Sequence, residues 1–278
     1  MHCYFNGKIT LLEKVSIHPY DVGVLRGFGV FEVLRTYNGK PFEIASHLDR
    51  LSQSAKVLNL SPPIDKKEVT KTIEKLLAIN KFSSSKEAVI RIVLTGGKSE
   101  DGFNYHPTSP TFFILTEPFN QLPSKYYMNG IKLITHEYQR EFAIAKTLNY
   151  MSALRLQDQK AKENAFEILY KSNDRILEAS TSNFFIVKDK KVITPKDDIL
   201  LGVTRDVVIK LAKSNGFKVE ERETYSSEIK SADEAFITAT NKDIVPVIKV
   251  DKITIGDGKV GKNTKDLMKL FYEFTSSI

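Results

Sequence analysis

Arg91 is a charged side chain in an apolar setting. In the segment AVIRIVL it shares one face of an expected strand with Val89 and Val93. A guanidinium between valines requires an anion nearby. That anion is either a carboxylate of the protein, in an ion pair, or the carboxylate of a bound substrate, held by two parallel hydrogen bonds. The sequence leaves both interpretations open.

The segment Leu200–Arg205 (LLGVTR) places a glycine and a threonine at the start of an expected helix. The unpaired N–H groups and the positive dipole end of a helix N-terminus favour a phosphate. A threonine in this place is more often a simple helix cap, so the signal is weak on its own. The sequence GKS at 97–99 imitates the end of a phosphate-binding P-loop, but Ile92 stands where that motif requires its first glycine.

Thiol and metal chemistry find little support. Cys3 is the only cysteine, which excludes a disulfide within the chain and a thiolate metal cluster. The five histidines, at positions 2, 18, 47, 106 and 136, lack the i, i+4 spacing of a helical metal site and have no carboxylate cluster beside them in the sequence. We therefore expect no metal.

The composition is that of a soluble globular protein, with 278 residues, 41% hydrophobic and 27% charged. A chain of this length favours two domains. The net charge of +7 comes from scattered lysines, without a basic run, a zinc pattern or an RNA-binding aromatic signature, so we expect no nucleic-acid partner. No apolar stretch approaches the roughly 18 residues of a membrane helix, and no signal peptide is evident. We expect a cytoplasmic protein without a membrane partner.

Hydrophobic periodicity predicts mixed elements in the first half. An Asn-Gly turn at 38–39 joins two runs as a hairpin, and an Asp-x-x-Glu pattern at 65–68 opens a helix. The predicted strands are 30–36, 41–44, 87–94 and 111–115, with helices from about Ser46 and from Asp65. The long loop at 96–110 between two of these strands suggests a functional flap.

The second half is also mixed and follows a proline-containing segment of little periodicity. We predict strands at 131–135, 183–187, 192–194, 217–220, 235–239 and 245–250, and helices at 149–162, 203–215 and near the C-terminus. The predicted division is an N-terminal α/β domain at 1–118, an interdomain linker at 119–130 and a C-terminal domain at 131–278.

Several short segments together resemble the fold type IV family of pyridoxal-phosphate enzymes, which includes branched-chain and D-amino-acid aminotransferases and aminodeoxychorismate lyases. They are GFGVFE at 27–32, HLDRL at 47–51, KTLNY at 146–150, EASTSNFF at 178–185, LGVTR at 201–205 and AFITAT at 235–240. Each is short, but their order covers nearly the whole chain. The resemblance implies an α+β fold, with a small N-terminal α/β domain, a larger β-rich C-terminal domain and pyridoxal 5′-phosphate at their interface.

The resemblance also implies roles for individual residues. Lys146 would hold the cofactor as a Schiff base and then shuttle a proton. Glu178 would face the pyridine nitrogen, and Tyr150 would lie near the phenolic oxygen. The cofactor's phosphate would be bound by Arg50, the amides of Val203 and Thr204, the Thr204 hydroxyl and Thr240.

The substrate is less clear from the sequence. The loop at 95–102 lacks the Gly-Met-Gly-Val type sequence of typical branched-chain members, and Phe31 stands where well-known D-amino-acid enzymes have tyrosine, without their Arg-x-His pair. Arg26 and Arg91 offer two guanidinium groups for substrate carboxylates, and the alternative interpretation of Arg26 is an exposed loop residue. In the family the homodimer brings the Arg26 loop against the partner's site.

We therefore expect a cytoplasmic, homodimeric aminotransferase that moves the amino group of a D-amino acid, such as D-alanine or D-glutamate, to a 2-oxo acid such as 2-oxoglutarate or pyruvate. Two alternatives within the family are a branched-chain L-amino-acid aminotransferase and an aminodeoxychorismate lyase. The alternative outside it is a non-enzymatic, anion-binding protein, which the positive charge alone would favour.

Overall fold

The computed structural model describes residues 1–278 and contains two units. The first comprises residues 1–120, 145–150 and 278, and the second comprises residues 121–144 and 151–277. Both mix helices with strands, and the second is dominated by its sheet, which confirms the predicted α+β class. No helix combines the length and the apolar character that crossing a membrane requires.

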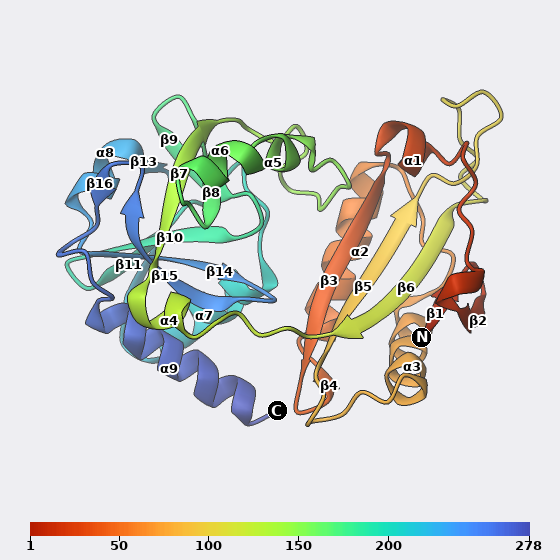
Figure 1. Cartoon of the computed structure of the whole chain (residues 1–278), viewed down its shortest axis with the longest axis horizontal. Coiled ribbons are helices and arrows are strands. Elements are labelled where there is room, and N and C mark those ends of the chain that lie inside the picture. Colours follow the sequence, from red (N-terminus) through yellow and green to blue (C-terminus); the bar gives the residue numbers. More distant parts are fainter. The chain divides into compact units, whose positions relative to one another are not determined.

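The first unit is built on a six-stranded antiparallel sheet in the order β2-β1-β6-β5-β3-β4 (Figure 1). Its strands are β1 (His2–Phe5), β2 (Lys8–Leu11), β3 (Gly29–Tyr37), β4 (Lys40–Pro41), β5 (Ala88–Thr95) and β6 (Thr111–Pro118). The 3-10 turn η1 (Leu12–Lys14) and the short helix α1 (Val22–Arg26) connect β2 to β3. The long strands β3, β5 and β6 lie side by side at the centre of this sheet.

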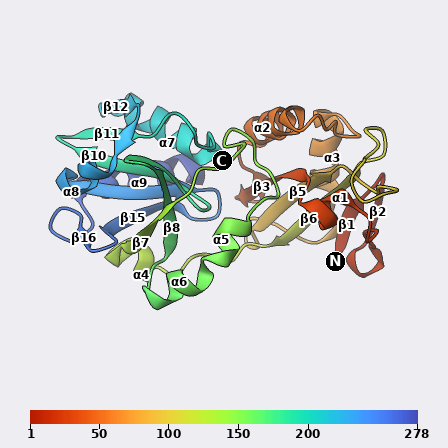
Figure 2. The ribbon, with the colours of Figure 1, turned by 90° about the horizontal axis from the view of Figure 1, so that it is seen from above.

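Two helices, α2 (Ile44–Val57) and α3 (Lys66–Ile79), cover one face of this sheet (Figure 2). Alternate residues of the central strands point toward them, because side chains alternate across a strand. Leu34, Ile90 and Ile92 are completely buried there, together with Ile73 and Leu76 of α3. The predicted apolar faces of both helices therefore form the core of the first unit.

The predicted turn and cap are confirmed. Asn38 and Gly39 both have positive φ, 49° and 75°, as a tight hairpin turn requires. Asp65 caps α3, because its carboxylate accepts a hydrogen bond of 2.8 Å from the backbone N–H of Glu68. The predicted strand at 41–44 is wrong in extent, since β4 ends at Pro41. Glu43 adopts a left-handed conformation with φ 47°, which turns the chain into α2 two residues before the predicted Ser46.

The second unit contains a ten-stranded mixed sheet in the order β12-β11-β10-β14-β15-β7-β8-β9-β13, with β16 paired to β15. Its strands are β7 (Ile131–Glu137), β8 (Glu167–Ser172), β9 (Arg175–Ala179), β10 (Asn183–Lys188), β11 (Lys191–Thr194), β12 (Lys218–Glu221), β13 (Thr224–Tyr225), β14 (Glu234–Ala239), β15 (Asp243–Val250) and β16 (Ile253–Thr254). Every strand predicted in this half is present, and no boundary differs from the predicted one by more than two residues.

Helices α7 (Val203–Ser214) and α9 (Lys262–Ser276) pack on each other and on β14, which buries their apolar faces.

The single helix predicted at 149–162 is wrong. The chain instead forms two short helices, α5 (Met151–Arg155) and α6 (Gln157–Lys162), separated at Leu156. Leu156 is 5% exposed and packs in a small cluster with Ile168 and Tyr170, so burial of this side chain accompanies the break. The segment predicted as a linker at 119–130 contains the short helix α4 (Lys125–Asn129), which packs on β15.

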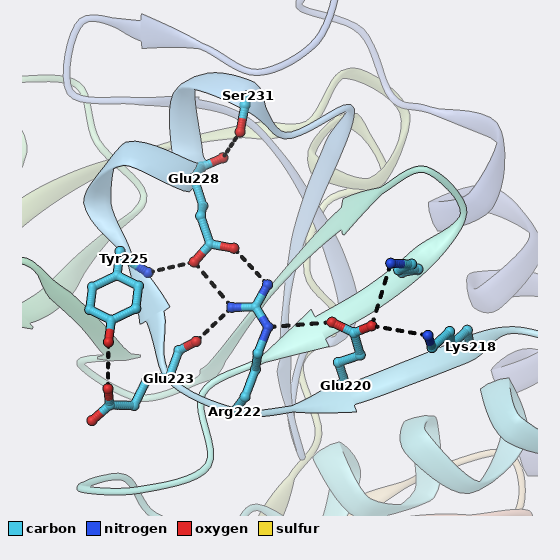
Figure 3. A network of polar contacts seen from close by, with 8 residues as sticks. Lys218, Glu220, Arg222, Glu223, Tyr225, Glu228 and Ser231 are labelled. Atoms are coloured by element: carbon cyan, nitrogen blue, oxygen red, sulfur yellow. Dashed lines mark hydrogen bonds and ion pairs between the residues drawn. The ribbon is translucent and has the colours of Figure 1, made fainter.

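In the second unit a polar network connects β12, β13 and the short helix α8 (Ser226–Ser231) (Figure 3). The Arg222 guanidinium donates to Glu228 at 2.7 and 3.1 Å and to Glu220 at 3.3 Å. Glu228 also accepts from the backbone N–H of Tyr225 at 2.9 Å, which satisfies one donor at the start of α8. These contacts hold β12, β13 and α8 together and involve none of the predicted site residues.

Candidate active site

The backbone around Lys146 belongs to the first unit and is held on two sides. The Lys146 carbonyl accepts from the backbone N–H of Phe31 at 2.9 Å, and the Leu148 N–H donates to the Gly29 carbonyl at 2.9 Å, so this segment lies along β3. On the other side the Lys146 N–H donates to the hydroxyl of Ser54, on α2, at 3.0 Å. This backbone is therefore anchored to both a strand and a helix.

The Lys146 amine lies among aromatic groups. Its Nζ is 4.5 Å from the centre of the Phe31 ring and 3.5 Å from the hydroxyl of Tyr150, to which it donates. The Phe31 and Tyr150 rings meet edge to face, with centroids 5.5 Å apart. A primary amine in such a setting can bond covalently to an aldehyde carbon and can take up or release a proton. The structure thus brings together three residues that the sequence analysis selected.

Arg50, also in the first unit, lies in a buried cluster with Glu32 and His47. Its Nε donates to Glu32 Oε1 at 2.7 Å and its Nη2 to Oε2 at 2.8 Å, which is a bidentate ion pair. His47 Nδ1 lies 2.8 Å from the same Oε2. The Arg50 charge and hydrogen bonds bring the pKa of the Glu32 carboxyl down to about 2, although its complete burial acts in the opposite direction. Burial lowers the pKa of His47.

In the second unit, Glu178 lies near the end of β9 and is 7% exposed. Arg140 donates to its Oε1 from Nε at 2.8 Å, and the backbone N–H of Leu200 donates to Oε2 at 3.0 Å. Arg140 is itself anchored by donating to the Ala143 carbonyl. The carboxylate of Glu178 therefore has a fixed orientation and a cationic neighbour.

The start of α7 lies against β10. No side chain caps this helix, whose N-cap is Gly202, and helix geometry leaves the N–H groups of its first turn, including those of Val203 and Thr204, without intrahelical partners. The side chain of Asn183 donates to the Leu200 carbonyl at 2.7 Å, and its oxygen lies where a Cβ at Gly202 would stand. Only glycine fits at this point without displacing Asn183.

The end of β14 lies next to the same asparagine. Thr238 pairs with Asn183 across the β10–β14 ladder, and the buried hydroxyl of Thr238 has no hydrogen-bond partner in the structure. Thr240, half-buried, follows directly after β14. The predicted phosphate-binding residues Val203, Thr204 and Thr240 therefore come from two segments that both flank Asn183.

The two arginines expected to bind substrate differ in their surroundings. Arg91 points away from the helices, opposite Val33, and its Nε donates to Glu117 Oε1 at 3.1 Å, with the two side chains 38% and 45% exposed. The structure thus places a protein carboxylate beside Arg91, one of the two anions that the sequence allowed. Arg26 is exposed in the last turn of α1, where its Nη1 donates to the carbonyl of Leu25 at 3.0 Å.

Sequence reasoning assigned no role to Glu32, His47 or Arg140. A signal for Glu32 was available, because it alternates with Val30 and Leu34 on the face of β3 that the helices cover, where an unpaired carboxylate is very costly. The local sequence around Arg140 has no comparable pattern. No group of three or more histidine, cysteine or acidic side chains is arranged to hold a metal.

Comparison with known proteins identifies the family. Residues 29–250 match the model of class IV aminotransferases. The chain is 35% identical to a putative branched-chain-amino-acid aminotransferase of Methanocaldococcus jannaschii, over 98% of this chain and 95% of the relative. It is 32% identical to a D-alanine aminotransferase of Listeria monocytogenes, over 98% and 96%. The solved structure of the Escherichia coli branched-chain amino acid aminotransferase matches with a TM-score of 0.92 at 27% identity, covering 99% of this chain and 95% of that chain. The chain belongs to the class IV aminotransferases.

Class IV aminotransferases use pyridoxal 5′-phosphate. The chemistry of the residues present fits this cofactor. A lysine amine such as that of Lys146 can bond to an aldehyde like that of the cofactor, and an oriented carboxylate such as that of Glu178 is a suitable partner for a protonated pyridine nitrogen. The glycine-backed start of α7 and the unpartnered hydroxyl of Thr238 offer donors to a phosphate.

Proposed function

We propose that this aminotransferase transfers the amino group of a D-amino acid, such as D-alanine or D-glutamate, to a 2-oxo acid such as 2-oxoglutarate or pyruvate. The observation that carries the chemistry is the Lys146 amine between Phe31 and the Tyr150 hydroxyl. The D-amino-acid preference is supported by the D-alanine aminotransferases at 32% identity over 98% of this chain and by the absence of the typical branched-chain loop at 95–102.

The cofactor, when bound, supplies an aldehyde that accepts the amino group and a ring that accepts electrons from the substrate's α-carbon. We assign Lys146 to covalent attachment and then to moving the proton at the α-carbon, with Tyr150 orienting its amine. Glu178, oriented by Arg140, holds the proton on the pyridine nitrogen. The phosphate is held by Arg50, Val203, Thr204 and Thr240.

For the substrate, Arg91 and Arg26 supply guanidinium groups to carboxylates, and Phe31 contacts the substrate's apolar part. Support for Arg91 comes from its position on β5, where it lies on the same face as Phe31, on the neighbouring strand β3. A substrate carboxylate can replace Glu117 there, because that ion pair is partly exposed and therefore weak. Arg26 lies on an exposed helix end, where its guanidinium donates to the Leu25 carbonyl and is not paired with a carboxylate.

The alternative, a branched-chain L-amino-acid aminotransferase, is favoured by the relative at 35% identity and by the solved structure with a TM-score of 0.92. The deciding experiment follows the visible absorption band of the cofactor-loaded enzyme after separate addition of D-alanine, D-glutamate, L-glutamate and L-leucine. Faster loss of the band with a D-amino acid supports the proposal. Faster loss with L-leucine replaces it with the branched-chain alternative, and release of pyruvate from aminodeoxychorismate without an acceptor indicates the lyase.

We further propose that the enzyme acts as a homodimer in the cytoplasm. Apolar side chains around α1 support self-association, since Val24 is 62% and Phe103 75% exposed, with Tyr20 and Leu25 also exposed. Light scattering at micromolar concentration should give twice the chain mass of 31.5 kDa. Val24→Asp should shift this value toward the monomer, whereas a monomeric wild-type protein would contradict the proposal.

A further inference from the structure

Glu32 is a charged residue on the helix-covered face of the first sheet. It lies on β3 between Val30 and Leu34 in sequence, and its exposed fraction is zero. Both of its oxygens are bonded to residues of α2, by the two hydrogen bonds from Arg50 and by the contact with His47 Nδ1. This carboxylate therefore links the central strand to the helix that carries Arg50.

Joining a helix to a sheet through such a buried ionic cluster has a large desolvation cost. Apolar residues of similar volume often stabilise a core as well as a buried ion pair does, because removing two charges from water is costly. Elsewhere α2 contributes Leu48, Leu51 and Ala55 to the apolar core beneath it. Packing alone therefore gives no reason for Glu32, and its effect on Arg50 is the more informative property.

The geometry restricts how the Arg50 side chain can be oriented. Two parallel N–H···O bonds fix both the plane and the direction of a guanidinium, whose side chain otherwise samples many rotamers. Glu32 is itself held in the centre of a sheet, and His47 lies one turn before Arg50 on the same helix. The orientation of Arg50 is thus determined by the strand as well as by its own helix.

The charge of the cluster explains why orientation matters. Burial lowers the pKa of His47, so this side chain is neutral at neutral pH, and its Nδ1–H then donates to Glu32. Its Nε2 is buried without a partner. With Glu32 ionised and Arg50 cationic, the cluster is close to neutral overall. Because the cluster has little net charge, it attracts an approaching anion only weakly over a distance. Binding of the anion then depends mainly on N–H groups of Arg50 that point toward it.

We propose that Glu32 is the positioning residue that orients the Arg50 guanidinium toward the phosphate of the cofactor. This inference rests on the phosphate-binding role proposed above for Arg50. Glu32 itself does not touch the phosphate. Its contribution is to select cofactor forms that carry a phosphate, so pyridoxal 5′-phosphate and pyridoxal should be affected differently when Glu32 is changed.

The experiment measures the dissociation constants of pyridoxal 5′-phosphate and of pyridoxal for the full-length protein after removal of bound cofactor. Glu32→Asp keeps the charge but shortens the side chain, so Arg50 loses its fixed orientation. We expect its affinity for pyridoxal 5′-phosphate to fall about tenfold, roughly the effect of one charge-assisted hydrogen bond. Its affinity for pyridoxal should change by less than about twofold, because no phosphate contact is involved.

Controls separate orientation from stability. Glu234 is a buried carboxylate of the second unit that accepts hydrogen bonds from Asn263 and Thr264 at the start of α9. Glu234→Asp should lower the melting temperature without changing the ratio of the two dissociation constants. If Glu32→Asp does not fold, Glu32→Gln is the second variant. It keeps the shape of the side chain but weakens the bidentate contact with Arg50, so it should also reduce the preference for pyridoxal 5′-phosphate over pyridoxal. Tighter binding of pyridoxal 5′-phosphate by Glu32→Gln would mean that Glu32 acts by charge repulsion, and this would overturn the inference.

Arg50→Ala distinguishes this inference from the proposal on which it rests. If Arg50→Ala leaves the preference for pyridoxal 5′-phosphate over pyridoxal unchanged, the phosphate role of Arg50 is wrong. If Arg50→Ala removes the preference and Glu32→Asp leaves it intact, only the positioning role is wrong. With both correct, adding Glu32→Asp to Arg50→Ala should cause no further loss of preference.

Discussion

At the scale of single residues, the amine of Lys146 is the group on which the proposed chemistry depends. Lys146→Ala removes both the covalent attachment and the proton carrier, so we expect transamination to fall by at least about 10²–10⁴-fold. The visible absorption band of the lysine-bound cofactor should be absent. Thermal unfolding should change little, because the backbone hydrogen bonds of residue 146 to Phe31 and Ser54 remain.

Lys249 provides the control for this prediction. It is an exposed lysine of β15, and Lys249→Ala should leave both turnover and the absorption band unchanged. Near wild-type turnover of Lys146→Ala would refute the assignment of the catalytic lysine.

The Arg91–Glu117 pair yields a second prediction at this scale. Because the pair is partly exposed, its free energy lies in the range of about 0.2–1 kcal/mol. Glu117→Gln should therefore lower the KM for 2-oxoglutarate modestly, by about two- to fivefold, as it removes the competing carboxylate. Arg91→Ala should raise the same KM without a matching loss of kcat.

Steady-state kinetics with varied 2-oxoglutarate, combined with thermal melts of both variants, tests this pair. A lower melting temperature with unchanged KM in both variants would assign Arg91 a structural role only.

At the scale of elements, a glycine lies at each end of α7, Gly202 before its start and Gly216 after its end, and the two differ in how much space surrounds them. A Cβ at Gly202 would overlap the side-chain oxygen of Asn183, whereas a Cβ at Gly216 would meet no atom within 4 Å. Gly202→Ala should therefore displace the start of α7 and weaken binding of pyridoxal 5′-phosphate. Gly216→Ala should leave this binding unchanged and cost about 1 kcal/mol of stability, because Gly216 has a φ of 82°.

Cofactor titrations and urea unfolding of the two variants give the comparison. Equal cofactor affinities for Gly202→Ala and the wild type would contradict a phosphate site at the start of α7.

At the scale of the whole molecule, stability should fall in acid. The folded-state pKa of Glu32 is about 2, against an ordinary value of 4.5, so its stabilisation is present above pH 4.5 and is lost as the pH falls toward 2. The difference corresponds to about 3 kcal/mol at most. His47 acts in the same direction. Its folded-state pKa is lowered, so protonation favours the unfolded chain once the pH falls below about 6.5.

Urea unfolding at several pH values between 7 and 3 checks this prediction. The difference in unfolding free energy between the wild type and Glu32→Gln should be largest at neutral pH and should narrow as the pH falls. A difference that stays constant over this range would mean that Glu32 is not ionised in the folded protein.

The sequence by itself determined the local structure of much of this protein. The periodicity of α2, α3, α7 and α9, the turn at Asn38 and the cap at Asp65 were all predictable. Each depends on residues within a few positions of one another, so propensity, capping and turn chemistry are sufficient to predict it. The family was also evident from the order of short motifs along the chain.

The tertiary structure decided which distant residues meet. The partner of Glu32, which is Arg50, and the contact of Arg140 with Glu178 across 38 positions of the chain were not predictable from local patterns. It also left open which anion lies beside Arg91, and it did not show that residues 145–150 pack with the first unit. These contacts depend on strand register and on the desolvation of buried charges, and both are set only when the sheet and its helices have assembled.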